Sequence, residues 1–260
     1  MIETVFGLTP AVLLLLLLVA FLAGFIDAVA GGGGMLTIPA LLTAGLPPHM
    51  ALGTNKLCAS FGSVTASLTF YRRGIFQPRY WLAAAIGTAI GAMAGTLAAD
   101  QISAEWLNQL LPLIIIITAI YALISKPLTD DNQGTIPQKR RPRAQWLQGI
   151  SIGFYDGVAG PGTGSFWTLS NMALYRMNLL YSSGLARVMN CISNVVSLLT
   201  FAALGHVNLL LGASLGFALM IGAYVGARSA ISLGSRFIRP VFTLVVLGIA
   251  CRLVWQNWMG

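Results

Sequence analysis

Apolar runs alternate with short polar stretches along the whole chain, and they fall into two matching sets of five. The first set lies at residues 10–29, 35–44, 51–71, 80–99 and 106–125. The second set lies at residues 146–158, 165–174, 183–204, 208–227 and 240–255. Because a helix needs about 20 apolar residues to span a bilayer, the pattern predicts about eight to ten transmembrane or re-entrant helices. Whether the first two runs of each set cross fully or enter and leave on one side stays open.

Each set opens with the same motif, in which an aspartate stands beside a glycine-rich stretch. Asp27 precedes the glycines at residues 31–34, named here the first glycine break. Asp156 precedes the second glycine break at residues 160–164, at a shift of 129 (156 − 27). Further matches recur at a shift of 131: Lys56 falls on Arg187, and residues 90–95 fall on residues 221–226. Two acids in corresponding breaks of two corresponding runs are typical of transporters built from internal repeats.

Positive charges fall at opposite ends of corresponding runs. The loop at residues 72–79 carries three arginines, whereas the corresponding loop at residues 205–208 carries no Lys or Arg. The loop at residues 100–105 carries only acidic charges, whereas its counterpart at residues 228–239 carries three arginines. Short basic loops favour the cytoplasmic side of a membrane. Corresponding loops are therefore expected on opposite sides, which makes the two halves inverted-topology repeats.

The domain boundaries follow from this arrangement. The first transmembrane repeat is expected at residues 1–125, a basic cytoplasmic linker at residues 126–145 and the second transmembrane repeat at residues 146–260. Irregular glycine backbone inside a bilayer is tolerated only where protein or a wet cavity satisfies its polar groups. The two glycine breaks are therefore expected to meet at the centre of the protein.

Composition places the chain in a membrane. Hydrophobic residues make up 57% of the 260 residues and charged residues only 8%, whereas soluble domains carry roughly 25% charged residues. The predicted fold class is therefore an all-α integral membrane protein. The basic residues behind the net charge of +8 lie mostly between apolar runs, which indicates membrane topology rather than nucleic-acid binding. The three cysteines form no CxxC pair or metal-ligand spacing, so no metal or other cofactor is expected.

Four ionisable residues inside apolar runs are the first candidates for function, because such a residue costs about 2.5–3.5 kcal/mol on insertion scales. Asp27 and Asp156 are predicted to couple or gate transport; the alternative is that each caps a half-helix or pairs with a basic residue for structure alone. Lys56 and Arg187 are predicted to attract an anion to the centre. The alternatives are that Lys56 extends to the outer interface and that Arg187 is an ordinary basic residue near the inner end of its run.

The short runs that follow the glycine breaks offer helix starts to an anion. Exposed N–H groups and the positive end of the helix dipole attract anions there, and half-helices of transporters use this arrangement. The neighbouring amides and hydroxyls are equally suited to bind a substrate or to seal broken helix ends. The full set of predicted substrate-binding residues is Thr54, Asn55, Lys56, Arg187, Asn190, Gly33, Gly34, Gly162, Thr163, Gly164 and Ser165. No residue is predicted to be catalytic.

Six short motifs extend over nearly the whole chain. They are Ala-Gly-Phe-Ile-Asp-Ala at residues 23–28, the glycines at 31–34, Thr-Ile-Pro-Ala-Leu-Leu at 37–42, Gly-Thr-Asn-Lys-Leu at 53–57, Gly-Phe-Tyr-Asp-Gly at 153–157 and Gly-Pro-Gly-Thr-Gly-Ser-Phe at 160–166. In combination they resemble the TauE/SafE family of membrane permeases, and most closely its YfcA-like branch. The resemblance implies a multi-pass transporter of the bacterial inner membrane that exports sulfite or small organosulfur anions such as sulfonates. Relatives tend to have Lys where this chain has Arg187, and Arg binds bidentately where Lys is a point charge.

The predicted function is transport and not catalysis. The chain is expected to move a small anion by alternating access, with one half rocking against the other around a central cationic site. The predicted partners are a small anionic substrate and the lipid bilayer, with no nucleic acid. A homo-oligomer, the identity of the substrate, the direction of transport and the coupling ion stay open. The alternatives are a membrane-embedded sulfur-relay enzyme that uses Cys58 or Cys191, and a small-anion channel.

Overall fold

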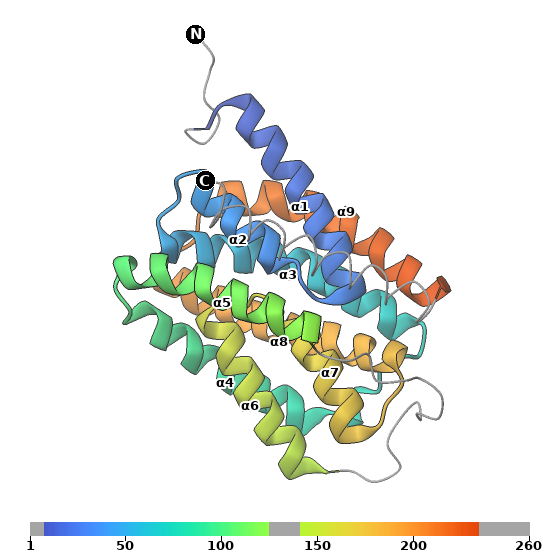
Figure 1. Ribbon diagram of the computed structural model, residues 1–260. Coiled ribbons are helices and arrows are strands. Elements are labelled where there is room, and N and C mark those ends of the chain that lie inside the picture. The colour runs from blue at the N-terminus through green and yellow to red at the C-terminus, as the bar shows by residue number, and fades with distance from the viewer. Residues whose placement is uncertain (1–7, 125–140, 234–260) are drawn as a thin grey trace.

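The computed structural model describes residues 8–124 and 141–233, and these residues form helices joined by short turns (Figure 1). The first described part contains α1 (Pro10–Ala30), α2 (Gly34–Thr43), α3 (Pro48–Arg72), the 3-10 helix η1 (Pro78–Tyr80), α4 (Leu82–Asp100) and α5 (Ala104–Ile124). The second contains α6 (Pro142–Val158), α7 (Thr163–Tyr175), α8 (Leu179–Ala203) and α9 (Leu209–Leu233). The predicted all-α fold is confirmed for this part of the chain. The predicted run at residues 240–255 lies outside the described residues.

Prolines and one glycine set several helix ends. α1, α3 and α6 begin at Pro10, Pro48 and Pro142, because the fixed φ of proline suits the first turn, where its missing N–H has no helical partner. As a result, α3 and α6 begin a few residues before the predicted starts of their runs. α1 ends at Gly31, whose φ of 86° is left-handed, a conformation that glycine adopts without strain.

α4 from the first half lies along α6 from the second half at a glycine-lined interface. Gly91 faces the backbone carbonyl of Ile150, and Gly95 faces the backbone carbonyl of Phe154. A Cβ atom on either glycine would overlap the facing backbone. Small residues at such positions let two helices approach closely in a membrane, so glycine is what fixes the distance between α4 and α6.

The same interface recurs between α9 and α1. Gly222 faces the backbone carbonyl of Phe21, and Gly226 faces the backbone carbonyl of Phe25. These positions correspond to those of the α4–α6 interface at the shifts of the sequence repeat, 131 (222 − 91) for the glycines and 129 (150 − 21) for the carbonyls. The repeat in the sequence is thus accompanied by a repeat of contacts, and each half packs on the other.

The helices gather into two bundles, each of which contains helices from both halves. We name α1, α2, α3 and α9 the α1 bundle, and α4, α6, α7 and α8 the α6 bundle. Figure 1 shows α1 and α9 on one side of the molecule and α4 and α6 on the other, with α3 and α8 between them. The contact between α3 and α8 joins the two bundles.

α3 and α8 run in opposite directions past each other. His49 at the start of α3 stacks on His206, which follows the end of α8, with ring centroids 5.1 Å apart. At the other end, Phe70 of α3 and Leu179 of α8 belong to one apolar cluster. Two helices that correspond in the sequence repeat are therefore antiparallel in space.

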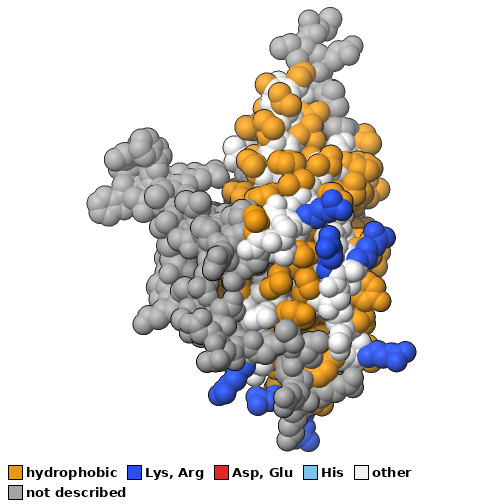
Figure 2. Space-filling view, turned by 90° about the vertical axis from the view of Figure 1, so that its right-hand side faces the viewer, with side chains coloured by type: hydrophobic (Ala, Val, Ile, Leu, Met, Phe, Trp, Pro, Cys, Tyr) orange, Lys and Arg blue, Asp and Glu red, His pale blue; other side chains and the backbone are white. Residues whose placement is uncertain are grey.

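The outer surface of the described helices is suited to lipid. Four of them, α1, α4, α8 and α9, are long and apolar enough to cross a membrane. Leu14, Leu15 and Leu18 of α1 stay exposed, and Figure 2 shows a largely hydrophobic face whose part towards the N-terminus carries no Lys or Arg side chain. A soluble protein rarely exposes a continuous apolar surface of this kind, so the chain is a membrane protein. α3 is long as well, but it carries buried polar residues such as Lys56 along its inner face.

Candidate functional site

The two glycine breaks touch each other inside the protein. A Cβ atom on Gly31 would lie 2.6 Å from the Cα atom of Gly164, so the backbones make contact because neither residue has a side chain. Ser165 Oγ donates a hydrogen bond of 2.9 Å to the carbonyl of Ala30. We name this contact the glycine crossing (Ala30, Gly31, Gly164 and Ser165). It joins the end of α1 to the start of α7, and so it joins the two bundles.

Two ion pairs accompany the glycine crossing, and each connects one half of the chain with the other. Lys56 Nζ on α3 lies 3.0 Å from Asp156 Oδ1 on α6. Arg187 Nη1 on α8 lies 3.9 Å from Asp27 Oδ2 on α1. The acid of each half thus pairs with the base of the other half. Because both pairs also bridge the two bundles, they hold the bundles together at the centre.

Both cations lie deeper than the sequence indicated. Lys56 comes eight residues after Pro48 at the start of α3 (56 − 48), and Arg187 comes eight residues after Leu179 at the start of α8 (187 − 179). Each is therefore about 12 Å into its helix, with a side chain that is 1% exposed for Lys56 and 0% for Arg187. The alternative in which Lys56 extends to the outer interface is wrong, because its amine is bonded inside the protein. Arg187 is equally buried and is no ordinary inner-surface arginine.

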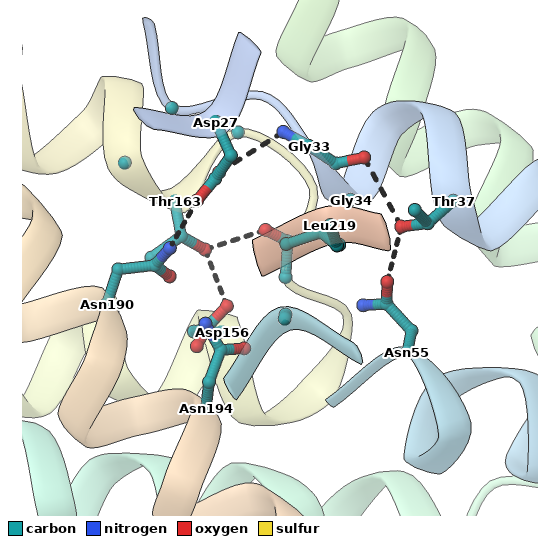
Figure 3. Close-up of a pocket in the computed structure, with 15 residues that line it drawn as sticks. Asp27, Gly33, Gly34, Thr37, Asn55, Asp156, Thr163, Asn190, Asn194 and Leu219 are labelled. Atoms are coloured by element: carbon teal, nitrogen blue, oxygen red, sulfur yellow. Dashed lines mark hydrogen bonds between the residues drawn. The ribbon is translucent and has the colours of Figure 1, made fainter. Parts of the chain in front are cut away.

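A small polar cavity lies beside the glycine crossing (Figure 3). Its volume of about 20 Å³ is room for about one water molecule. Nine of the thirteen predicted site residues line it: Asp27, Asp156, Asn55, Asn190, Gly33, Gly34, Gly162, Thr163 and Gly164. The predicted residues that surround the breaks are thus brought together around one space.

The other four predicted site residues are not among the described residues that line the cavity. Lys56 and Arg187 direct their head groups to the carboxylates with which they pair. Thr54 Oγ1 accepts a hydrogen bond of 3.0 Å from the backbone N–H of Asn208, and Ser165 belongs to the glycine crossing. In this conformation the cavity is faced by carboxylates, amides and hydroxyls, while both cations are covered. A central cationic site stays a prediction.

Each carboxylate also binds its own glycine break. Asp27 Oδ1 accepts a hydrogen bond of 3.2 Å from the backbone N–H of Gly33, and Asp27 Oδ2 accepts one of 3.4 Å from Asn190 Nδ2. Asp156 Oδ1 accepts a hydrogen bond of 2.9 Å from Thr163 Oγ1. Figure 3 shows both acids at the cavity with these partners beside them. The acids therefore fix the shape of the breaks and face the cavity at the same time.

Two further polar residues line the cavity: Thr37 was missed by the sequence analysis, and Asn194, an amide in an apolar run that could bind a substrate or seal a broken helix end, was left out of the predicted site. Thr37 Oγ1 donates a hydrogen bond of 3.3 Å to the carbonyl of Gly33 and is bonded to Asn55 Oδ1. Asn194 lines the cavity from α8, one turn after Asn190 (194 − 190). Residues four apart share a helix face, so spacing from a predicted residue was the signal that would have found both.

The cysteines lie away from this chemistry. Cys58 is fully buried, and its thiol donates a hydrogen bond of 3.3 Å to the carbonyl of Gly212. Neither Cys58 nor Cys191 is among the described residues that line the cavity. The sulfur-relay alternative therefore has no thiol at the cavity in the described part of the chain.

A second polar cluster lies where α3 begins. His206 Nε2 lies 2.8 Å from Asp100 Oδ1, and His49 Nε2 lies 3.0 Å from the carbonyl of Ile102. We name these residues the His–Asp cluster (His49, Asp100, Ile102 and His206). No site was predicted here. Because α3 belongs to the α1 bundle and α4 to the α6 bundle, the cluster joins the two bundles at one end of the molecule.

Known proteins match this chain over nearly its full length. A family model described as sulfite exporter TauE/SafE matches residues 16–253. A probable membrane transporter protein, ORF9, from a Sinorhizobium species is 40% identical over 254 residues, which cover 94% of this chain and 95% of the relative. The probable membrane transporter protein YfcA of Escherichia coli K12 is 35% identical over 267 residues, which cover 99% and 98% of the two chains. A probable membrane transporter protein of Haemophilus influenzae is 36% identical and covers 95% of this chain and 96% of its own length. No solved structure matches the chain.

Proposed function

The chain belongs to the TauE/SafE family of membrane transporters, and from that premise we propose that it carries a small anion by alternating access. The proposed substrate is sulfite or an organosulfur anion such as a sulfonate, and the proposed location is a bacterial inner membrane, which the chain crosses several times. The observation that carries this proposal is the pair of exchanged ion pairs, Lys56 with Asp156 and Arg187 with Asp27. Buried charges inside a membrane protein mark the path of a substrate or ion by default.

Inverted topology is part of the proposal, and two independent observations support it. Basic loops stand at opposite ends of corresponding runs in the sequence, and short basic loops favour the cytoplasmic side of a membrane. In addition, α3 and α8, which correspond in the repeat, pass each other in antiparallel directions, with His49 beside His206 at one end and Phe70 near Leu179 at the other. Inverted repeats with broken helices at their interface are a common transporter architecture.

The moving parts are the two bundles and not the two halves of the sequence. Glycine-lined interfaces hold α1 against α9 and α4 against α6, and close-packed interfaces of this kind move as rigid bodies. Among the described residues, the contacts between the α1 bundle and the α6 bundle include the α3–α8 contact, the glycine crossing, the two ion pairs and, at one end of the molecule, the His–Asp cluster. Rocking of one bundle against the other opens these contacts from one side of the membrane at a time.

The described conformation is a closed one. A cavity of about 20 Å³ holds about one water molecule, and a sulfite or sulfonate ion is larger than that. Substrate therefore binds after the bundles have moved apart. A carrier with such a closed intermediate saturates and exchanges substrate, whereas a small-anion channel does neither, and this difference separates the two alternatives.

The test is transport by the purified full-length protein in proteoliposomes. Uptake of radiolabelled sulfite is measured with and without excess unlabelled sulfite inside, and unlabelled sulfate, thiosulfate, methanesulfonate and acetate are tried as competitors. We expect saturable uptake that internal sulfite accelerates. The double variant D27N/D156N should lose this uptake, while E105Q, which removes an exposed acid at the start of α5, should keep it.

Each contrary result overturns a named part of the proposal. Uptake that stays linear with concentration and gains nothing from internal sulfite favours the channel. Loss of uptake in the double variant C58S/C191S favours the sulfur relay. Absence of sulfite uptake removes sulfite as the substrate, and the same measurement with radiolabelled methanesulfonate decides whether sulfonates are removed as well.

A further inference from the structure

The head group of Arg187 is buried with hydrogen-bonding capacity to spare. Its side chain is 0% exposed, and Nε makes one long bond of 3.4 Å to the carbonyl of Ser183 in its own helix. Nη1 lies 3.9 Å from Asp27 Oδ2, which is too far for a hydrogen bond. Among the described residues, neither Nη1 nor Nη2 has a hydrogen-bond partner. Buried groups of this kind are nearly always bonded in a native protein, so the guanidinium lacks a ligand in this conformation.

The corresponding cation of the first half is satisfied. Lys56 Nζ donates a hydrogen bond of 2.5 Å to the backbone carbonyl of Asp156 and lies 3.0 Å from Asp156 Oδ1. Two of the three donors of an ammonium group are thus accounted for at short distance. The two ion pairs correspond in sequence but differ in state: one is tight, and the other is open.

The surroundings of Arg187 are shaped for an anion. A Cβ atom on Gly31 or on Gly164 would lie 2.6 Å from Nη2, so the guanidinium rests against bare backbone on both sides of the glycine crossing. Gly164 belongs to the first turn of α7, which has 13 residues, and a helix start adds positive potential. The unbonded N–H groups of Arg187 and the start of α7 therefore lie next to each other at the glycine crossing.

We propose that Arg187, and not Lys56, holds the transported anion, and that Nη1 and Nη2 bind two of its oxygen atoms in parallel. This inference rests on the proposed function and specifies its substrate class. Parallel bonds of this kind need a ligand with at least two oxygens on one centre, such as sulfite, a sulfonate or a carboxylate, and they do not form with a halide. Asp27 is the competitor of the substrate, because it occupies the same cation when the site is closed.

The glycine crossing covers this site. Ser165 Oγ bonds to the carbonyl of Ala30 at 2.9 Å, and Gly31 and Gly164 lie directly over the guanidinium. Binding of an oxyanion therefore requires the crossing to part and Arg187 to leave Asp27. The Lys56–Asp156 pair stays closed during this step and fixes the other break.

The test compares the two carboxylates with each other. Removing the competitor should strengthen anion binding, so D27N should bind more tightly if Arg187 is the site, and D156N should do so if Lys56 is. The purified full-length protein in detergent is titrated with sodium methanesulfonate at constant ionic strength against sodium chloride, and the apparent melting temperature is followed, since a ligand that binds the folded state raises it. We expect roughly tenfold tighter binding or more in D27N than in wild type, no gain in D156N and no response to chloride. The variant D27N/R187K should lose the gain.

The assignment would be overturned if D156N gained more affinity than D27N, if both variants gained equally, or if neither gained. It would also be overturned if D27N/R187K kept the gain in affinity of D27N. Should D27N fail to fold, R187K in the wild-type background replaces it, and unchanged methanesulfonate binding there counts against Arg187. Flux of sulfite in proteoliposomes is read separately. Oxyanion binding at Arg187 without flux would support the binding site and contradict the transport function. Flux without this binding pattern would support the transport function and contradict the binding site.

Discussion

Lys56 and Asp156 are one hundred residues apart in the sequence (156 − 56) and form a buried ion pair of 3.0 Å between Nζ and Oδ1. Lys56 belongs to the α1 bundle and Asp156 to the α6 bundle. The pair therefore crosses the surface along which the two bundles are proposed to move. The corresponding pair, Arg187 with Asp27, crosses the same surface at 3.9 Å. We name the Lys56–Asp156 pair the tight link, because its charged atoms are closer together.

Removing one partner of the tight link should destabilise the protein more than removing both. K56A leaves Asp156 buried and unpaired, and we expect a loss of roughly 3–5 kcal/mol, because an uncompensated buried charge is costly. The double variant K56A/D156A removes the unpaired charge and should recover part of the loss. Apparent unfolding free energies of the four proteins in detergent form a double-mutant cycle. Additive losses would show that the two side chains do not interact.

The glycine-lined interfaces should tolerate no added methyl group. A Cβ on Gly95 would overlap the carbonyl of Phe154, and one on Gly226 would meet the carbonyl of Phe25. We expect G95A and G226A each to cost about 1–3 kcal/mol, the usual penalty of overpacking, and to cost similar amounts because the interfaces correspond. Thermal unfolding in detergent measures the loss.

A neighbouring position supplies the control for these variants. Ala94 is exposed on the same helix as Gly95, so A94V adds more volume at a place that faces outwards. It should leave the apparent melting temperature nearly unchanged. A loss in A94V equal to that in G95A would mean that α4 is sensitive to any substitution and that the interface has no special role.

The sequence predicted the helices and the central meeting of the breaks, because apolar runs and glycines are local signals. It did not predict which acid pairs with which base. Spacing places Asp27 and Lys56 along the chain, but the partner depends on how α1, α3, α6 and α8 cross in space. The run that contains Lys56 was predicted to begin at residue 51, whereas α3 begins at Pro48, and Lys56 was therefore placed too near a helix end.

The lining of the cavity was predicted in part for a similar reason. Residues close to the breaks, such as Gly33 and Thr163, were found because the breaks mark the centre. Thr37 was missed, and Asn194 was left out of the predicted site, because each lies one helix turn after a residue that was predicted. That Arg187 keeps unbonded donors while Lys56 does not depends on distances of a few tenths of an ångström, which no sequence pattern contains.

Transport of a monovalent oxyanion should be accompanied by a proton. In the closed structure Arg187 and Asp27 balance each other. An anion on Arg187 leaves Asp27 as an extra negative charge in a buried place, which is costly unless the carboxylate is neutralised. Four further groups act on Asp27: the backbone N–H of Gly33 and the amide of Asn190 donate hydrogen bonds to it, and the charges of Lys56 and Asp156 oppose each other. Uptake of a proton by Asp27 is thus the simplest way to keep the site neutral.

This coupling is measured in proteoliposomes with imposed gradients. Uptake of radiolabelled methanesulfonate, which stays monovalent over the pH range used, should respond in the wild-type protein to a pH gradient and not to a membrane potential. D27N carries no titratable group at this position, so its uptake should lose the response to pH and gain one to potential. Uptake by the wild type that follows potential alone contradicts the coupling.

The His–Asp cluster should bias the side from which the site opens. It joins α4 to the turn after α8 at one end of the molecule through the 2.8 Å contact of His206 with Asp100, and His206 in turn stacks on His49 at the start of α3. The contact is partly exposed and is worth at most about 1 kcal/mol, so H206A should lower the unfolding free energy only slightly. It should, however, increase labelling of a cysteine introduced at Asn55 by an impermeant thiol reagent added from that end, in a background without native cysteines. Unchanged labelling would limit the cluster to a structural role.

A methyl group at the glycine crossing should prevent full closure. Gly164 lies in the first turn of α7, and a Cβ there would come within 2.7 Å of Gly31 Cα and 2.6 Å of Arg187 Nη2, so G164A can keep its backbone conformation only if the crossing opens. A94V is the control, since it enlarges an exposed side chain of α4 away from the crossing.

We expect G164A to bind methanesulfonate at least as well as the wild type, because an opened crossing uncovers Arg187, and to transport sulfite more than tenfold more slowly, because alternating access passes through the closed state. A94V should resemble the wild type in both measurements. Titration of the apparent melting temperature reports binding, and flux in proteoliposomes reports transport. If G164A instead lost binding and transport together, the glycine crossing would be part of the anion-binding site and not a cover over it. A methyl group that only keeps the crossing open would not lower the affinity for an anion that binds beneath it.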